Sequence, residues 1–364
     1  MDFGFYLPTK LICFEGCVRE SKDLIAKIGK KPLIVTGKRS ARACGALDDV
    51  LSVTEGGVIF DGVRQNPASA SCFEAAKIAR ENGCDFVIGI GGGSPLDAAK
   101  ASAVLAADPD LDEAGLYAGG WKRDPLPVVC VGTTAGTGSE VTAVAVITDS
   151  QGRKRSVKGD RIFPALSLGD WRYTRGLDAH FTASTAVDAL AHCVESYLNR
   201  TANGFSESLA ALGIKRLAGP LSRLAGGGIP DGLDRRDLYE ASLLGGMAIS
   251  VTGTAMCHAM GYFLSEDHGI SHGFACGLYL ETFIELTEKA APDAVKAMLA
   301  DSGIAKEELF EILRALLKNE NVTVGAEEAA SLSERWTDNK SIKKSLFTLS
   351  AGEADGIVKK LFVR

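Results

Sequence analysis

The sequence predicts an α/β N-terminal domain with a parallel sheet, followed by an all-helical C-terminal domain. In the first half of the chain, short and continuous apolar runs alternate with helical patterns, which is typical of a parallel sheet covered by helices. From about residue 179 onward, long helical stretches dominate. The length of 364 residues also favours two domains. We therefore place the domains at residues 1–178 and 179–364.

Each expected element follows from its own pattern. Strands are predicted where an apolar run is too short for a helix and has no polar face: Lys31–Thr36, Asp85–Ile90 and Leu126–Val131. Helices are predicted where apolar residues recur with a period near 3.6: Ser69–Asn82, Pro95–Ala106, Ala183–Asn199, Phe205–Leu217, Leu233–Ile249 and several segments toward the C-terminus.

Composition excludes several classes of function. Hydrophobic residues make up 46% and charged residues 24% of the chain, which is ordinary for a globular enzyme. The net charge of -6 leaves no basic excess for nucleic acid. No apolar run has the length of a membrane span, and the N-terminus lacks the pattern of a signal peptide. The nine cysteines contain no CxxC pair, so we expect small packing residues in a cytoplasmic protein rather than disulfides or a thiolate zinc site.

The segment Gly89–Lys100 (GIGGGSPLDAAK) joins a predicted strand to a predicted helix through three glycines. Glycines let a phosphate approach the backbone closely, and the start of a helix offers free N–H groups. We expect Ser94 to cap this helix and Pro95 to be its first residue. The alternative is a tight turn without a ligand, and the spacing differs from the GxGxxG fingerprint.

A second turn of the same kind, Gly132–Thr142 (GTTAGTGSEVT), also follows a predicted strand. Its glycines and hydroxyl side chains are suited to lining a nucleotide groove, although such loops are common. Because ligands of open α/β sheets bind at the carboxyl ends of the strands, two such turns in one sheet favour a nucleotide site.

All five histidines lie between His180 and His272. Asp188 and His192 are four residues apart and share one helix face, whereas His258 and His272 come much later in the chain. Three imidazoles and one carboxylate suit Fe(II), zinc or a similar ion and leave a position for substrate. The alternatives are a surface hydrogen bond for the Asp–His pair, a buried structural role for His258 and a turn position for His272.

The motifs GGGSPLDAAK, TTAGTGSEVT, TAVDALAH and His272-Gly273 together resemble the iron-containing (group III) alcohol dehydrogenases, from about Lys31 to Gly277. The resemblance implies a dinucleotide-binding α/β domain and a helical metal-binding domain, in a dehydroquinate synthase-like architecture. It also implies an NAD(P)-dependent oxidoreductase that interconverts an alcohol and an aldehyde or ketone. Fe(II) is expected ahead of zinc, in a homodimer or larger homo-oligomer.

The resemblance assigns roles to individual residues. The metal ligands would be Asp188, His192, His258 and His272. The nucleotide contacts would be Gly91, Gly92, Gly93, Ser94, Asp97, Thr133, Thr134, Thr137, Ser139, Lys154 and Phe181. Many relatives carry a further histidine, linked to proton relay, at the position of Tyr262. His268 is therefore either a substitute catalytic residue or an exposed turn residue.

The end of the first predicted strand bears on the choice of cofactor. An NAD enzyme usually places an acidic residue there to bind the ribose 2′-hydroxyl, but this chain has Gly37, followed by Lys38, Arg39 and Ser40. Basic and hydroxyl groups are suited to a 2′-phosphate, so we predict a preference for NADP over NAD, with Gly37, Lys38 and Ser40 in contact with the cofactor. The alternative is that Lys38 and Arg39 are a solvated surface pair.

Other functions share these features. Glycerol dehydrogenases and dehydroquinate synthases have the same architecture, and the second of these catalyses no net redox change. A nucleotide-binding protein without catalysis is a third alternative, although the presence of all four candidate metal ligands argues against it.

Overall fold

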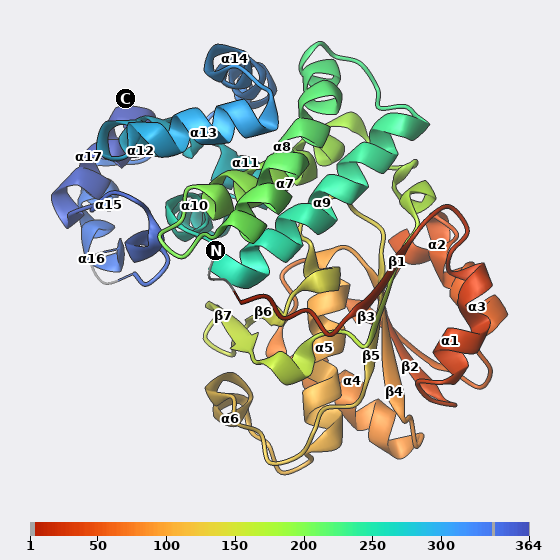
Figure 1. Cartoon of the computed structure of the whole chain (residues 1–364). Coiled ribbons are helices and arrows are strands. Elements are labelled where there is room, and N and C mark those ends of the chain that lie inside the picture. The colour runs from red at the N-terminus through yellow and green to blue at the C-terminus, as the bar shows by residue number, and fades with distance from the viewer. Residues whose placement is uncertain (1–3, 337–338, 364) are drawn as a thin grey trace. The chain divides into compact units, whose positions relative to one another are not determined.

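The computed structural model describes residues 4–336 and 339–363, which form two compact units (Figure 1). The first unit spans Tyr6–Leu177. The second contains the described residues from Asp178 onward, together with Gly4 and Phe5. The ring of Phe5 packs against that of Phe205, with centroids 4.5 Å apart, which explains why the start of the chain belongs to the second unit.

A six-stranded parallel sheet forms the centre of the first unit. In spatial order its strands are β1 (Lys10–Cys13), β8 (Leu166–Gly169), β5 (Val128–Gly132), β4 (Phe86–Gly91), β2 (Pro32–Gly37) and β3 (Val58–Val63). The three strands predicted from continuous apolar runs are confirmed as β2, β4 and β5. The sequence patterns did not reveal β1, β3 and β8.

Alternate residues of the central strands pack into separate cores on the two faces of this sheet. Leu33 and Val35 of β2 belong to one core, whereas Ile34 between them belongs to the other. The helices α4 (Ser69–Glu81) and α5 (Gly93–Ala107) contribute to the first core. The second core contains residues of α1 (Lys22–Ala26), α2 (Ser40–Ala43) and α3 (Ala46–Val53). Burial on both faces explains why these strands are apolar throughout.

A small hairpin, β6 (Val144–Thr148) with β7 (Lys154–Lys158), lies outside the main sheet, and helix α6 (Glu113–Ala118) packs beside β7. Glu113 Oε1 accepts hydrogen bonds from Ser69 Oγ at 2.5 Å and from Ser150 N at 2.9 Å. Its Oε2 accepts one from Ser150 Oγ at 2.5 Å. Glu113 therefore joins the hairpin turn to the start of α4.

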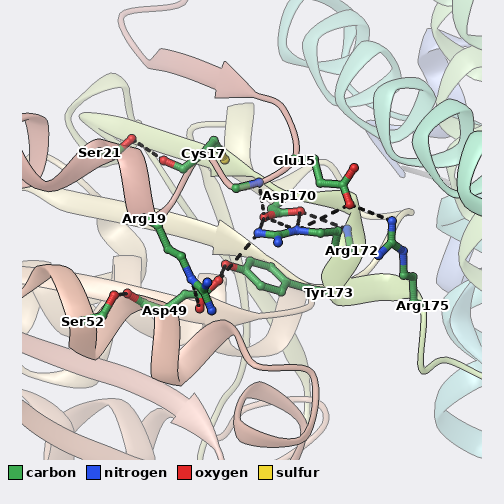
Figure 2. A network of polar contacts seen from close by, with 11 residues as sticks. Glu15, Cys17, Arg19, Ser21, Asp49, Ser52, Asp170, Arg172, Tyr173 and Arg175 are labelled. Carbon is green, nitrogen blue, oxygen red and sulfur yellow. Dashed lines mark hydrogen bonds and ion pairs between the residues drawn. The ribbon is translucent and has the colours of Figure 1, made fainter.

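A polar network lies at the carboxyl end of β8 (Figure 2). Asp170 Oδ2 accepts hydrogen bonds from Gly16 N at 2.8 Å and from the Arg172 guanidinium at 2.5 Å. Asp49 accepts one from Tyr173 Oη at 2.9 Å and one from Arg19 Nε at 2.7 Å. These carboxylates connect α3 to the segments that follow β1 and β8, which is a structural role.

The regular elements in the described part of the second unit are helices. They are α7 (Ala179–Tyr197), α8 (Gly204–Ala225), α9 (Gly232–Thr252), α10 (Met256–Asp267), α11 (His272–Gly277), α12 (Leu280–Ala290), α13 (Pro292–Ser302), α14 (Lys306–Leu317), α15 (Ala326–Ser331), α16 (Ser333–Trp336) and α17 (Ala351–Phe362). Helices α7, α8 and α9 pack against one another and confirm the three predicted helical segments.

Across residues 4–336 and 339–363, no single helix has both the length and the apolar character of a membrane span. Helices α9 and α10 have the length and apolar character of a membrane span only when they are counted as one segment, and the pair is bent by 113°.

Candidate metal centre

Helix α7 carries a stripe of three polar side chains within a buried helix. Asp188, His192 and Glu195 follow one another at intervals of four and three residues, so they lie on one helix face. All three are buried, with at most 5% of each residue exposed. Because buried charged groups are stable only when they are paired or bound to a metal, this stripe indicates a site rather than a packing surface.

The structure brings the four predicted ligands together. Asp188 Oδ1 lies 3.4 Å from His258 Nε2, 3.8 Å from His272 Nε2 and 4.0 Å from His192 Nε2. His258 is on α10, and His272 is the first residue of α11. Two ligands of one ion, each about 2.0–2.3 Å from it, are at most about 4–4.6 Å apart. All three imidazoles are therefore close enough to share an ion with Asp188.

A carboxylate oxygen and an imidazole nitrogen that face each other in this cluster lack a hydrogen bond. Among the described residues, Asp188 Oδ1 and His258 Nε2 are buried, and neither has a hydrogen-bond partner. Such groups are rare in native proteins because their desolvation is not compensated. A cation between them would satisfy both atoms at once, so the donor set fits a divalent ion.

Glu195 orients His258 within the cluster. Its Oε2 is hydrogen-bonded to His258 Nδ1, and its Oε1 accepts hydrogen bonds from Cys257 N at 2.6 Å and His258 N at 3.3 Å. A carboxylate on one imidazole nitrogen leaves the other nitrogen available as a ligand. The sequence analysis missed Glu195, although its position seven residues after Asp188 places it on the ligand face of α7.

Cys276 is a second residue that the sequence analysis missed. It lies one helical turn after His272 on α11, and its Sγ belongs to a group with donor atoms of Asp188, His258 and His272 that all lie within 4.8 Å of one another. All nine cysteines are free thiols, and Cys276 is fully buried. Most of the cysteines were expected to be small packing residues, and Cys276 has a different environment from that expectation.

The surroundings of Asp188 keep its carboxyl group in the charged form that binds a cation. Burial alone would raise the pKa of Asp188, but interactions with the imidazoles of His192, His272 and His258 outweigh it and hold that pKa well below its ordinary value. Asp188 is therefore ionised near neutral pH.

The close packing of α11 against α7 positions His272. A Cβ atom at Gly273 would lie only 1.8 Å from Ser184 O on α7 and 3.0 Å from Asp188 Cβ, so only glycine fits. Ser184 Oγ also donates a hydrogen bond to Ser271 Oγ at 2.8 Å. The glycine after His272 is thus explained by helix contact.

His268 lies outside the cluster. Its Nε2 is 3.1 Å from Glu328 Oε1, and its ring packs edge-on against Phe263. Tyr262, at the position where many relatives carry a histidine, stacks on His272 with ring centroids 5.5 Å apart and an interplanar angle of 25°. A catalytic role for His268 stays a prediction that no contact with the cluster supports.

In the first unit, the two glycine-rich turns touch each other at the carboxyl edge of the sheet. Thr133 N donates to Gly91 O at 2.9 Å. Cβ atoms at Gly92 and Gly93 would lie 3.0 Å and 2.9 Å from the side chains of Thr134 and Thr137, respectively. The glycines are therefore needed for the contact between the turns, whatever ligand they bind.

The expected cap of α5 is wrong. The helix begins at Gly93 with Gly92 at the N-cap position, and Ser94 is already inside the helix. Ser94 Oγ accepts a hydrogen bond from Asn66 N at 3.2 Å instead. Because the glycines adopt the turn without a side-chain cap, the helix starts earlier than Ser94 and Pro95 suggested.

Lys100 holds the second turn in place. Its buried ammonium donates to Ser139 O at 2.6 Å, Thr142 O at 2.9 Å and Val144 O at 2.9 Å. Asp97, one turn earlier on α5, accepts hydrogen bonds from Ser139 Oγ and Val146 N. Asp97 and Ser139 therefore have structural partners, and their contact with a cofactor stays a prediction.

The remaining predicted cofactor residues occupy separate places. Gly37 ends β2, and Lys38 and Ser40 are exposed beside it. Because β2, β4 and β5 are neighbouring parallel strands, the turns that follow them lie along the same carboxyl edge of the sheet. Lys154 lies on β7, outside the main sheet. Phe181 lies in the first turn of α7, in the second unit, and is 40% exposed.

The first unit has a parallel sheet with glycine-rich turns, and the second is helical with a carboxylate–imidazole cluster. This combination is the one expected of a metal-dependent dehydrogenase with a dinucleotide cofactor. The family model described as iron-containing alcohol dehydrogenase matches residues 8–171. The model described as the C-terminal part of the Fe-containing alcohol dehydrogenase family matches residues 182–348. The chain belongs to the iron-containing alcohol dehydrogenase family.

Individual relatives agree. The chain is 32% identical to a probable alcohol dehydrogenase, EutG, of Escherichia coli, over 83% of each chain. It is 29% identical to an NADPH-dependent butanol dehydrogenase of Clostridium saccharobutylicum, over 87% of this chain and 83% of that one. A crystal structure of an iron-containing alcohol dehydrogenase from Thermotoga maritima is 36% identical, with a TM-score of 0.92 and 99% of each chain covered.

Proposed function

We propose that the chain is a metal-dependent alcohol dehydrogenase that prefers NADP and interconverts a small alcohol with its aldehyde or ketone. The observation that carries this proposal is that His192, His258 and His272 each place a ring nitrogen within 4.0 Å of Asp188 Oδ1. Asp188 Oδ1 and His258 Nε2 are buried and lack hydrogen bonds. The family makes the alcohol–carbonyl chemistry the expected reaction. We also propose a cytoplasmic homodimer or larger homo-oligomer, as the family resemblance implies.

The side chains at this centre have different proposed roles. Asp188 and the three imidazoles would hold Fe(II), with zinc as the second candidate, and Glu195 keeps His258 Nε2 directed into the site. The bound ion would act as a Lewis acid toward the alcohol or carbonyl oxygen, and the nicotinamide would carry the hydride. Asp188, His192 and His258 are buried, which strengthens their electrostatic interactions, whereas the His272 side chain is 34% exposed.

The carboxyl edge of the sheet would bind the cofactor. The N–H groups at the start of α5, which begins at Gly93 after Gly91 and Gly92, are suited to the diphosphate. Lys38 and Ser40, both exposed beside Gly37, are suited to a 2′-phosphate. The name of the Clostridium relative, an NADPH-dependent enzyme, supports this choice.

A substrate panel tests the activity. The purified protein is loaded with Fe(II), Zn(II) or Mn(II) and assayed with alcohols and aldehydes by the absorbance of reduced nicotinamide. We expect metal-dependent turnover, and we expect His272→Ala to lose both retained metal and activity. A metal-replete protein without any net absorbance change would favour a dehydroquinate synthase-like or non-catalytic function, and a fully active, metal-replete His272→Ala would refute the ligand assignment.

The cofactor preference has its own test. We expect kcat/KM to be higher with NADP than with NAD, and Lys38→Ala to reduce it with NADP more than with NAD. Lys77→Ala is the matched control, because Lys77 is a largely exposed lysine on α4. A preference of the wild-type protein for NAD would contradict the proposal.

A further inference from the structure

Cys276 adds a sulfur atom to a cluster otherwise made of nitrogen and oxygen donors. Its Sγ lies 3.9 Å from His272 Nε2, a separation comparable to the 3.8 Å between His272 and Asp188. The donor atoms of Cys276, Asp188, His258 and His272 all lie within 4.8 Å of one another. Asp188 Oδ1 and His258 Nε2, which are buried and lack hydrogen bonds, belong to this same group.

A comparison with Cys193 shows that this placement is not a general feature of buried cysteines. Cys193 is also fully buried, in the same unit and beside His192 in the sequence. Its Sγ, however, packs where Gly213 and Gly245 leave room on α8 and α9, 2.5 Å and 3.2 Å from the places of their absent Cβ atoms. Cys193 thus fills space between helices, whereas Cys276 faces ligand atoms.

We propose that Cys276 adds a thiolate to the ligands of the divalent ion held by Asp188, His192, His258 and His272, and that it shifts the metal preference of this chain toward zinc, relative to the same site without sulfur. This inference rests on the metal site of the proposed function. As the sulfur–metal bond forms, the thiol proton leaves to solvent, and no group is oxidised or reduced. Soft thiolate ligands favour zinc over iron in a mixed donor set, whereas carboxylates and imidazoles accept both.

Cobalt(II) provides a spectroscopic test that does not depend on activity. A thiolate bound to Co(II) gives a charge-transfer band in the near ultraviolet, which nitrogen and oxygen donors do not give. We expect this band in the full-length protein loaded with one Co(II) per chain. The band should disappear in Cys276→Ser and Cys276→Ala, and it should persist in the matched control Cys193→Ala.

Equilibrium dialysis of Co(II) separates this inference from the proposed function. Stoichiometric Co(II) binding without the band in the wild-type protein would overturn the role of Cys276 and leave the metal site intact. Absence of Co(II) binding to the wild-type protein would overturn both. A wild-type spectrum without the band overturns the inference even if one Cys276 variant fails to fold, and either of the two variants that folds assigns the band.

Metal competition tests the shift in preference. Loss of a residue that only hydrogen-bonds to a metal ligand already lowers metal affinity by about 10–100-fold. Loss of a direct ligand in Cys276→Ser should therefore weaken zinc binding by about tenfold or more. Fe(II) binding should weaken less, so that the ratio of the two affinities falls. An unchanged ratio, measured with a competing chelator, would contradict the proposed preference.

Discussion

Glu195 illustrates how a single residue without a predicted role controls the cluster. It is fully buried, and its two oxygens bind the ring of His258 and two consecutive backbone N–H groups at the start of α10. The same carboxylate therefore fixes both the helix that carries His258 and the direction of its Nε2 atom. A residue that binds no ion can thus decide whether one is bound.

Glu195→Gln should weaken metal binding by about 10–100-fold, because an amide cannot accept hydrogen bonds with both of its polar atoms. The measurement is zinc or cobalt affinity by chelator competition. Glu308→Gln, the same change at an exposed position of α14, should leave the affinity unaltered. Wild-type affinity in Glu195→Gln would show that His258 is oriented by packing alone.

Glu113 gives a prediction for pH. Hydrogen bonds from Ser150 and Ser69 lower the pKa of Glu113 from its ordinary value of 4.5. A carboxylate whose pKa is lower in the folded state stabilises the fold above its unfolded pKa, and this contribution is lost as pH falls through the folded pKa. The stability difference between the wild-type protein and Glu113→Gln should therefore be largest near pH 7 and shrink below about pH 4.5.

Thermal unfolding midpoints of the two proteins, measured across the acidic range, test this dependence. Glu74→Gln, on the exposed face of α4, serves as the reference substitution. A difference that stays constant with pH would mean that the hydrogen bonds of Glu113 do not depend on its charge.

At the scale of elements, the centre is assembled by direct contact between α11 and α7. The carbonyl group of Ser184 occupies the space that a side chain at Gly273 would need. This contact brings the first residue of α11, His272, to within 3.8 Å of the Asp188 carboxylate on α7. The geometry of the site is therefore a consequence of helix packing, which no local sequence pattern describes.

Gly273→Ala should push α11 away from α7, destabilise the protein by about 1–3 kcal/mol or more, and weaken metal binding. Gly356→Ala provides the contrast, because Gly356 is an exposed residue of α17 with open space at the position of a Cβ. That change should be neutral or stabilising by about 0.5–1 kcal/mol. Urea unfolding and chelator competition measure the two effects, and wild-type metal affinity in Gly273→Ala would argue against the role of this contact.

At the scale of the whole molecule, each unit has its own interior and its own candidate site. The parallel sheet has a core on each face, and the glycine-rich turns lie entirely within Tyr6–Leu177. The candidate metal ligands, together with Glu195 and Cys276, all lie in the second unit.

A fragment of residues 6–177 should therefore fold cooperatively and bind NADP without binding the metal. Circular dichroism melting and nucleotide titration test this expectation. A fragment of residues 6–164 lacks β8, which lies between β1 and β5, and should fail to fold. An unfolded 6–177 fragment would mean that the first unit depends on the rest of the chain.

Patterns within single segments were enough to predict the strands β2, β4 and β5 and the helices α7 to α9. The same kind of pattern placed Asp188 and His192 on one helix face. The patterns did not reveal β1, β3 and β8. Strands β1 and β8 have four residues each, and β3 is partly exposed, so their patterns are weak and their places depend on their neighbours. The clustering of the histidines in the sequence made His258 and His272 candidate ligands, and the family resemblance then assigned them that role.

The packing of the helices determines which further side chains reach these ligands. Glu195 and Cys276 acquire their places through contacts between α7, α10 and α11, and His268 turns to Glu328 although it precedes His272 by only four residues. Periodicity within a segment determines which residues share a face, whereas the packing of segments that are distant in the chain determines which atoms meet.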